Sequence, residues 1–284
     1  MIHVKNLEYT YPQSDTQAVK GIDFSIKKGE IFGFLGPSGA GKSTTQKILI
    51  KLLDGYNGDI QINSKNLNAY DSNYYENIGV SFELPNHFSK LTALENLQFF
   101  SELYNHQTRD IHDLLKQVGL EDHKHVKVSN FSKGMKMRLN FIRALLNDPE
   151  ILFLDEPTSG LDPVNAMIIK NLIMKEKEQG KTIFITTHNM QVADDLCDRV
   201  AFIVEGKIAE VDTPKELKLK HGKKAITVEY FDNNSVLYQE FELDKLGHNQ
   251  SFIELIRDYE VRTIHSMETT LEEVFIKVTG RRLL

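Results

Sequence analysis

The sequence predicts an α/β fold in which helices cover both faces of a parallel sheet. Ile31–Leu35 is a continuous apolar run, as expected of a buried strand, and a glycine-rich loop followed by a helical segment at 42–53 comes next. Two more apolar runs, 151–154 and 182–186, are separated by a helical pattern over 164–178. Strand–helix–strand order with apolar strands is typical of parallel sheets.

The remaining elements of this region are justified by shorter patterns. Residues 3–5, 22–26 and 59–62 read as short strands, and 201–204 continues the predicted parallel sheet. Between about 89 and 148, apolar residues recur at three- and four-residue spacing, which is the period of a helix. We therefore expect a helical subdomain inserted into an α/β domain.

The character of the chain changes after about residue 221. We expect an α/β domain at 1–220 and a C-terminal α+β domain at 221–284. The expected elements of the second domain are a hairpin of strands 225–231 and 236–243 turning at 232–234, a helix around 252–256, a strand at 261–267 and a last helix opened by the capping box Thr270-Leu271-Glu272-Glu273.

Composition excludes several classes of protein. The chain has 284 residues, a formal charge of −6 and 40% hydrophobic residues, which is incompatible with bulk disorder. Its apolar runs fall far short of the roughly 20 residues of a spanning helix, and its start has no secretory signal. Cys197 is the only cysteine, which precludes an internal disulfide. The acidic balance argues against a general nucleic-acid binder.

The glycine-rich loop fits the pattern G-x-x-x-x-G-K-[ST], and its strand–loop–helix context is the one this pattern requires. Glycines let backbone N–H groups surround phosphate oxygens, and the helix N-terminus adds a favourable dipole. We expect Lys42 to reach the β- and γ-phosphates of ATP and Ser43 to place its hydroxyl on Mg²⁺. The expected nucleotide-binding residues of the loop are Gly36, Pro37, Ser38, Gly39, Ala40, Gly41, Lys42, Ser43 and Thr44.

Two carboxylates follow the apolar run 151–154. Beside a phosphate-binding loop, Asp155 at a strand end is expected to join the Mg²⁺ shell. Glu156 points elsewhere because side chains alternate along a strand, and it is placed to accept a proton from the attacking water. Alone, such a pair more often begins a solvated turn; its position after a buried strand in a chain with this loop favours catalysis.

A third segment, 131–135, reads F-S-K-G-M at a helix start, with Ser132 as a good N-cap. It resembles the LSGGQ signature of ABC ATPases, and over about 1–220 the chain resembles the nucleotide-binding subunit of an ABC transporter. The further matching motifs are the aromatic Tyr11, the Q-loop 78–83 with Glu83, the D-loop 159–162 with Asp162, the switch histidine His188, and the closing patterns 196–200 and 205–208.

The resemblance implies a fold and a set of roles. The fold is a P-loop NTPase with a RecA-like core sheet, an antiparallel β subdomain, an inserted helical subdomain and the C-terminal appendage. Tyr11 stacks on adenine, with Tyr9 as its competitor, and His188 senses the γ-phosphate beside the general base Glu156. The remaining implied nucleotide contacts are Glu83, which also contacts Mg²⁺, together with Ser132, Gly134 and Asp162, where the Ser132 helix faces the nucleotide of a second subunit.

Two departures from the family pattern point to a branch. Lys133 and Met135 replace the usual glycine and glutamine of the signature, and Glu83 replaces the usual glutamine, adding charge near the triphosphate. Such variants resemble the bacterial drug- and polymer-export branch with ABC-2-type permeases, and the ending 270–280 resembles the tail common there.

The resemblance implies an ATPase that powers export through a separate membrane permease at the cytoplasmic face of the membrane. Its implied partners are that permease and a second ATP-binding subunit, identical or homologous. No nucleic-acid partner is implied. The alternatives are an importer subunit, a soluble ABC ATPase acting on a ribosome or DNA, and a purely regulatory nucleotide-binding protein. The long insertions or second cassettes of ribosome and DNA-repair members are absent from the sequence. Cargo is left open.

Overall fold

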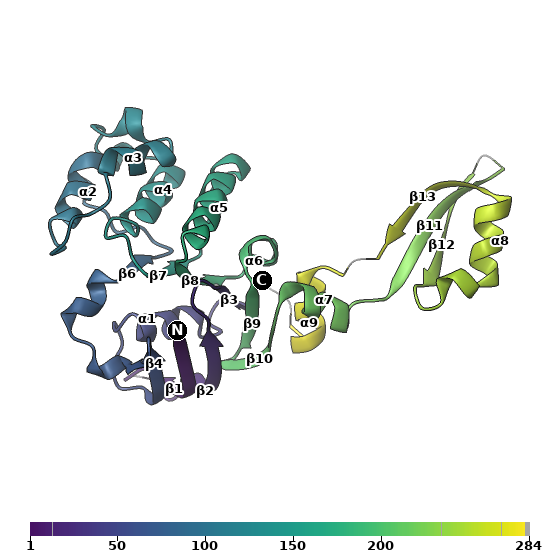
Figure 1. The fold of residues 1–284 in the computed structure, drawn as a ribbon, viewed down its shortest axis with the longest axis horizontal. Helices are drawn as coiled ribbons and strands as arrows, with labels where there is room; N and C mark the ends of the chain where they lie inside the picture. The colour runs from purple at the N-terminus through teal and green to yellow at the C-terminus, as the bar shows by residue number, and fades with distance from the viewer. Residues whose placement is uncertain (13, 234, 268, 282–284) are drawn as a thin grey trace. The chain divides into compact units, whose positions relative to one another are not determined.

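The computed structural model describes residues 1–12, 14–233, 235–267 and 269–281. These residues form two compact units, Met1–Thr213 and Pro214–Arg281 (Figure 1). The break lies before Pro214 instead of at about 221, because helix α7 (Pro214–His221) packs against helix α9 (Leu271–Thr279) and buries Leu217 completely. Composition shifts only after this helix, which explains why the sequence pattern places the boundary later.

The first unit contains two sheets. The smaller sheet is antiparallel with the order β2-β1-β4-β5, and the larger has the order β10-β9-β3-β8-β7-β6. In the larger sheet all neighbours are parallel except β10 and β9. The strands are β1 (Ile2–Thr10), β2 (Gln17–Ile26), β3 (Ile31–Leu35), β4 (Asn57–Ile62), β5 (Lys65–Asn66), β6 (Ile78–Ser81), β7 (Ile151–Asp155), β8 (Thr182–Thr187), β9 (Arg199–Val204) and β10 (Lys207–Asp212).

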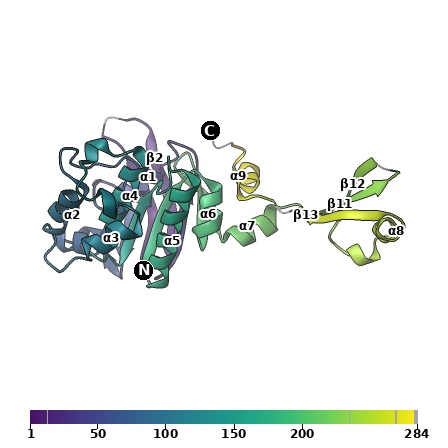
Figure 2. The same ribbon diagram turned by 90° about the horizontal axis from the view of Figure 1, so that it is seen from above.

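Helices cover both faces of the larger sheet, as predicted. On one face Phe32, Phe34 and Phe184 join a buried cluster that includes Ile48 of helix α1 and the smaller sheet. Helices α4, α5 and α6 lie side by side along the other side (Figure 2). The helices are α1 (Lys42–Leu49), α2 (Ala93–Ser101), α3 (Ile111–Gln117), α4 (Lys133–Arg143), α5 (Pro163–Glu178) and α6 (Met190–Leu196), with 3-10 turns η1 (Leu67–Ala69), η2 (Ser72–Glu76), η3 (Glu121–His123) and η4 (Val128–Asn130).

Several boundaries differ from the predicted ones. The helix expected at 42–53 ends at Leu49, because Lys51 takes a left-handed backbone with φ of 57° and the chain turns back. Strands β1 and β2 are longer than predicted. The region 89–148 is three separate helices, which cluster together as an inserted subdomain (Figure 1).

The second unit has its own sheet, with the order β12-β11-β13, and a small core formed by Ile226, Val228, Phe241 and Leu255. Thr270 and Glu273 form the expected capping box at the start of α9. Asn234 of the predicted hairpin turn lies outside the described residues. The elements besides α7 and α9 are β11 (Ala225–Asp232), β12 (Ser235–Glu242), η5 (Leu246–His248), α8 (Gln250–Asp258) and β13 (Glu260–Ser266).

Candidate active site

A cleft of about 390 Å³ lies where β3, β7 and β8 end, which is the edge of a parallel sheet where ligands bind. It brings together predicted residues from five distant parts of the chain. Its walls are Tyr11, Ala18, Ser38, Gly39, Gly41, Lys42, Ser43, Thr44, Glu83, Asp155, Glu156 and His188. Ala18 was not predicted from the sequence, because an alanine in a strand carries no chemical signal.

The loop 36–44 turns sharply between β3 and the N-terminus of α1. Gly41 has φ of 106°, and a Cβ there would come within 2.8 Å of the Ala18 carbonyl oxygen. A Cβ on Gly36 would lie 2.1 Å from the Ile203 carbonyl oxygen. Both positions therefore require glycine. Gly36, Pro37 and Ala40 belong to the loop without lining the cleft, so their part is to shape its backbone.

Lys42 is the cation of the cleft. Its Nζ donates to the carbonyl oxygens of Gly36 at 2.7 Å and Pro37 at 3.0 Å, which holds the side chain along the loop. Burial lowers the pKa of Lys42, and the nearby carboxylates of Glu156, Asp155 and Glu83 oppose that shift. Three carboxylates around one ammonium give this cleft an excess of negative charge, which a bound cation would offset.

The residues beside Ser43 fit Mg²⁺. The Ser43 hydroxyl donates to Asp155 Oδ1 at 3.2 Å, so two hard oxygen ligands lie together at the cleft wall. Within the described ranges no group of three or more His, Cys, Asp or Glu side chains could hold a metal. A serine hydroxyl and a carboxylate are oxygen ligands of the kind that Mg²⁺ takes when it also binds substrate phosphates and water.

Glu156 and His188 form a tight pair. Glu156 Oε1 accepts hydrogen bonds from the His188 backbone N–H at 2.8 Å and from His188 Nδ1 at 2.6 Å, and Oε2 accepts one from the Thr187 hydroxyl at 2.8 Å. Glu156 has φ of 47°, a left-handed backbone that is rare for a residue with a side chain. Because of this turn and the alternation of side chains along the strand, the Glu156 carboxylate lies beside His188, whereas the Asp155 carboxylate lies beside Ser43.

The two candidate tyrosines differ in exposure. Tyr11 is 37% exposed, lines the cleft, and has its hydroxyl 3.1 Å from Thr44 Oγ1. Tyr9 is 5% exposed and packs edge-on against the Tyr11 ring at a centroid distance of 5.0 Å. Only Tyr11 therefore offers a ring face that a nucleotide base can reach.

Three predicted residues do not line this cleft. Ser132 caps α4 by accepting from the Met135 N–H at 3.2 Å, and Gly134 follows it in the first turn. Asp162 caps α5 by accepting from the Val164 and Asn165 N–H groups, both at 3.0 Å. Ser132 and Asp162 act as helix caps within the chain, and neither they nor Gly134 line the cleft, so any nucleotide they contact would have to be bound to another molecule.

Helix α4 is tied to the segment that carries Glu83. Asn140 donates to Ser81 Oγ at 2.9 Å and to the Phe82 carbonyl oxygen at 2.8 Å. Burial lowers the pKa of His87 to about 4, so its imidazole is neutral near neutral pH, and Nε2 donates to the Lys136 carbonyl oxygen at 3.0 Å. The Glu83 segment and the Ser132 helix therefore form one connected body.

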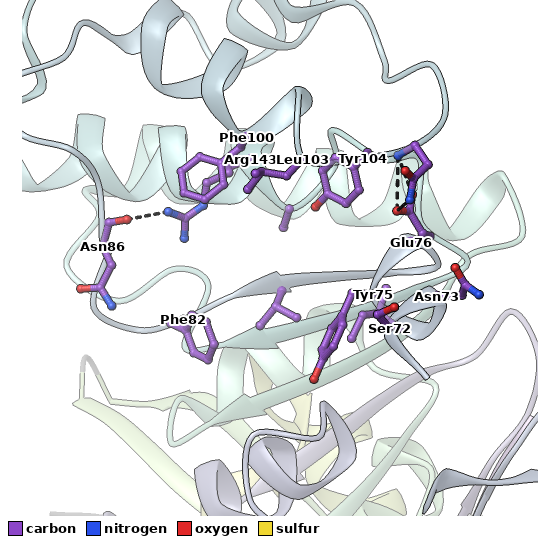
Figure 3. Close-up of a pocket in the computed structure, with 14 residues that line it drawn as sticks. Ser72, Asn73, Tyr75, Glu76, Phe82, Asn86, Phe100, Leu103, Tyr104 and Arg143 are labelled. Atoms are coloured by element: carbon purple, nitrogen blue, oxygen red, sulfur yellow. Dashed lines mark hydrogen bonds between the residues drawn. The ribbon is translucent and has the colours of Figure 1, made fainter. Parts of the chain in front are cut away.

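A second, larger groove of about 610 Å³ opens beside this tie (Figure 3). Aromatic and aliphatic side chains line much of it, among them Phe82, Phe100, Leu103 and Tyr104. Arg143, the last residue of α4, lies in its wall, with its guanidinium 4.7 Å from the Phe100 ring centroid.

Arg143 has no carboxylate partner in the part of the chain that the structure describes. It donates to the Asn86 carbonyl oxygen at 2.6 Å and to Asn140 Oδ1 at 2.7 Å. Glu76, the carboxylate of the same groove, instead pairs with His106 at 2.9 Å. Burial lowers the pKa of Arg143, as expected of a guanidinium without an opposite charge nearby.

Comparison with known proteins identifies relatives over the whole chain. The profile of the ABC transporter family matches residues 19–159, and that of the fluoroquinolone efflux ABC transporter C-terminal domain matches 224–268. A fluoroquinolones export ATP-binding protein of Mycobacterium tuberculosis is 52% identical over all of this chain and 94% of its own length. A bacitracin transport ATP-binding protein of Bacillus licheniformis is 33% identical over 98% of this chain and 97% of its own.

Solved structures agree with this similarity. A dimeric ATP-binding cassette in a post-hydrolysis state with ADP and phosphate superposes with a TM-score of 0.68 at 29% identity, covering 75% of this chain and 98% of that one. An ATP-binding subunit of an ABC transporter gives 0.70 at 27% identity, covering 78% and 92%. Among the residues described here, none of the helices has the length and apolarity needed to cross a membrane.

Proposed function

Because this chain belongs to the ATP-binding subunits of ABC transporters, which hydrolyse ATP to drive transport, we propose that its cleft between Lys42 and Glu156 is where ATP is cleaved to power export through a separate permease. The observation that carries this assignment is the convergence of the glycine loop, Asp155 and the Glu156–His188 pair on one cleft. The similar proteins are ATP-binding proteins of fluoroquinolone export and of bacitracin transport, which supports the proposal.

Each group of the cleft has a defined task in hydrolysis. Lys42 and the loop N–H groups hold the β- and γ-phosphates, and Mg²⁺, when bound at Ser43 and Asp155, offsets phosphate charge. Glu156 accepts a proton from a water whose oxygen bonds to the γ-phosphorus, while the bond from that phosphorus to the β–γ bridging oxygen breaks. His188 orients the Glu156 carboxylate through its Nδ1 contact. The products are ADP and inorganic phosphate.

The nucleotide is bound at its other end by Tyr11. Its accessible ring is placed to stack on adenine, whereas the Tyr9 ring is committed to the core. Glu83 lies on the cleft rim, where it can contact the ion or its waters.

The site is completed by a second copy or a homologue. Ser132, Gly134 and Asp162 lie outside the chain's own cleft, and the Ser132 helix has its N-terminus exposed to receive phosphate from another molecule. A head-to-tail pair places each Ser132 helix against the other subunit's nucleotide. The dimeric cassette with a similar fold supports this arrangement.

The partner in the membrane is proposed to dock in the groove that Arg143 lines. A partly buried guanidinium without a carboxylate favours an occupant that supplies one, and the aromatic walls favour apolar side chains beside it. We assign this occupant to a cytoplasmic segment of the permease, which places the chain at the cytoplasmic face of the membrane.

Replacing Arg143 by methionine tests the groove. The variant keeps the side-chain stem and removes the charge, so retention of the chain by its permease in detergent extracts is expected to fall at least about 30-fold. Arg138→Met, on the same helix but outside the groove, serves as the control and is expected to be retained like the wild type. Retention of Arg143→Met at the wild-type level, with an unchanged melting temperature, would refute this docking site.

The cargo proposed for the complete transporter is a fluoroquinolone-like drug. This rests on the 52% identical export protein and on the match of residues 224–268, which extends the similarity beyond the shared ATPase core. Cells lacking the chain are expected to accumulate more of a fluorescent fluoroquinolone than cells producing it, and cells producing Glu156→Gln should accumulate as much as the deletion strain. Equal accumulation in all three strains would reject this cargo.

A further inference from the structure

Gln46 is a buried polar residue that the hydrolysis scheme above does not use. It lies on α1 one turn after Ser43 and is 1% exposed. Its Oε1 lies 3.4 Å from Thr186 Oγ1, and its Nε2 has no hydrogen-bond partner within residues 1–12, 14–233, 235–267 and 269–281. A buried amide nitrogen without an acceptor costs about 1–3 kcal/mol, so the residue requires an explanation.

The hydrogen bonds of Thr186 supply that explanation. Its hydroxyl contacts both Asp155 Oδ1 and Gln46 Oε1, and both of those oxygens can only accept. A hydroxyl has one proton, so it cannot donate to both. Asp155 is a carboxylate at close range and therefore takes the proton, which leaves a Thr186 lone pair directed toward Gln46.

Rotating the Gln46 amide by half a turn resolves the conflict. The amide oxygen and nitrogen have nearly the same shape, so the exchange needs no additional space. The N–H₂ group then donates to Thr186, and the Thr186 hydroxyl donates to Asp155. The amide nitrogen then has an acceptor and the Thr186 proton goes to Asp155 alone, while the amide oxygen moves to the position that the nitrogen occupied.

We infer that Gln46 is a positioning residue for the Mg²⁺ ligand Asp155, acting through a one-way chain of hydrogen bonds from Gln46 to Thr186 to Asp155. Thr186 and Ser43 both contact Oδ1, so two hydroxyls from different elements hold the carboxylate through the same oxygen. Thr186 is fully buried, so water cannot replace it in this chain. The inference rests on the proposed function, because it assumes that Asp155 serves Mg²⁺.

The consequence is a specific loss in metal-assisted nucleotide binding. In Gln46→Met, which has nearly the same length and no hydrogen-bonding amide, Asp155 is held less firmly. The Mg²⁺ concentration for half-maximal binding of a fluorescent non-hydrolysable ATP analogue is expected to rise about fivefold, the effect of one hydrogen bond. Binding of the same analogue in EDTA is expected to stay at the wild-type level. A purely structural role would lower the melting temperature and leave the Mg²⁺ requirement unchanged.

A double-mutant comparison tests the route through Thr186. Thr186→Val removes the middle of the chain and is expected to raise the Mg²⁺ requirement at least as much as Gln46→Met. Adding Gln46→Met to Thr186→Val is expected to change nothing further, because Gln46 has no other path to Asp155. Gln191→Met, at an exposed glutamine of α6 bonded to Asp195, is the control and should match the wild type.

Each outcome decides the inference. An unchanged Mg²⁺ requirement in both Gln46→Met and Gln46→Leu, with the proteins folded, would overturn it. So would a further loss on adding Gln46→Met to Thr186→Val. If the wild-type chain binds the analogue equally well with Mg²⁺ and with EDTA, the Mg²⁺ site of the proposed function is wrong. Because that result needs no variant, it is distinguishable from a failure of the Gln46 inference.

Discussion

Lys42→Ala is expected to weaken ATP binding at least about 100-fold and to abolish turnover. The substitution removes the cation of the cleft and leaves Glu156, Asp155 and Glu83 facing the triphosphate without compensation. Losing charge-assisted hydrogen bonds to two phosphates costs of the order of 3 kcal/mol, which corresponds to about a 100-fold weaker affinity, and the added repulsion increases the loss. Equilibrium binding of a fluorescent ATP analogue with Mg²⁺ measures the effect.

The matched control for this experiment is Lys47→Ala on the same helix. Lys47 lies in the last turn of α1 and does not line the cleft, so its replacement removes an equal charge without touching the phosphates. It should bind ATP like the wild type. If Lys42→Ala retained wild-type affinity and turnover, the loop 36–44 would not be the phosphate site.

Glu156→Gln is expected to bind ATP and to stop cleaving it. Glutamine keeps the shape and the acceptor for the His188 N–H, but it cannot take a proton from water, so turnover should fall about 100-fold or more. The loss of one negative charge beside the phosphates favours retention of ATP. Two subunits should then remain together with MgATP and separate with MgADP, as measured by size-exclusion chromatography.

Adding Ser132→Arg to Glu156→Gln tests the composite site. Arginine places bulk and charge at the N-terminus of α4 and removes its cap, so the MgATP dimer should disappear. Thr270→Arg makes the same change at the capped N-terminus of α9 and should leave the dimer intact. A dimer that ignores both nucleotide and Ser132→Arg would contradict a head-to-tail site and point to the C-terminal unit.

The fold could be predicted from the sequence wherever a single kind of interaction determines the local structure, such as burial of a strand or capping of a helix. Apolar runs such as Ile31–Leu35 are buried on both faces, so their period alone identifies central strands. Caps were readable for the same reason: Thr270 and Ser132 each satisfy free N–H groups of the following helix. The end of α1 could not be predicted, because the residue in the left-handed conformation after the helix is Lys51, whereas a glycine usually marks such a position in the sequence.

The motif residues of the candidate site could be predicted from the sequence, whereas the buried residues that support them could not. The loop, Asp155, Glu156 and His188 carry chemical types at recognisable spacing, and one cleft gathers them. Thr186, Thr187 and Gln46 were missed, because a hydroxyl or amide inside an apolar segment shows its role only through neighbours from other strands. Arg143 was not predicted, because a sequence does not show whether an arginine has a carboxylate beside it in the folded chain.

The ties of α4 have a mechanical consequence. The helix has 11 residues and spans about 16 Å, with the Arg143 groove at one end and Ser132 at the other. A rod of that length tilted by about 5° moves its far end by about 1.4 Å, and a misplacement of about 1 Å in an active site can cost 100-fold in rate. If a permease segment fills the groove and Ser132 faces the nucleotide of a second subunit, as proposed, a tilt of this size at the groove would change the rate of hydrolysis in that second subunit by up to about 100-fold.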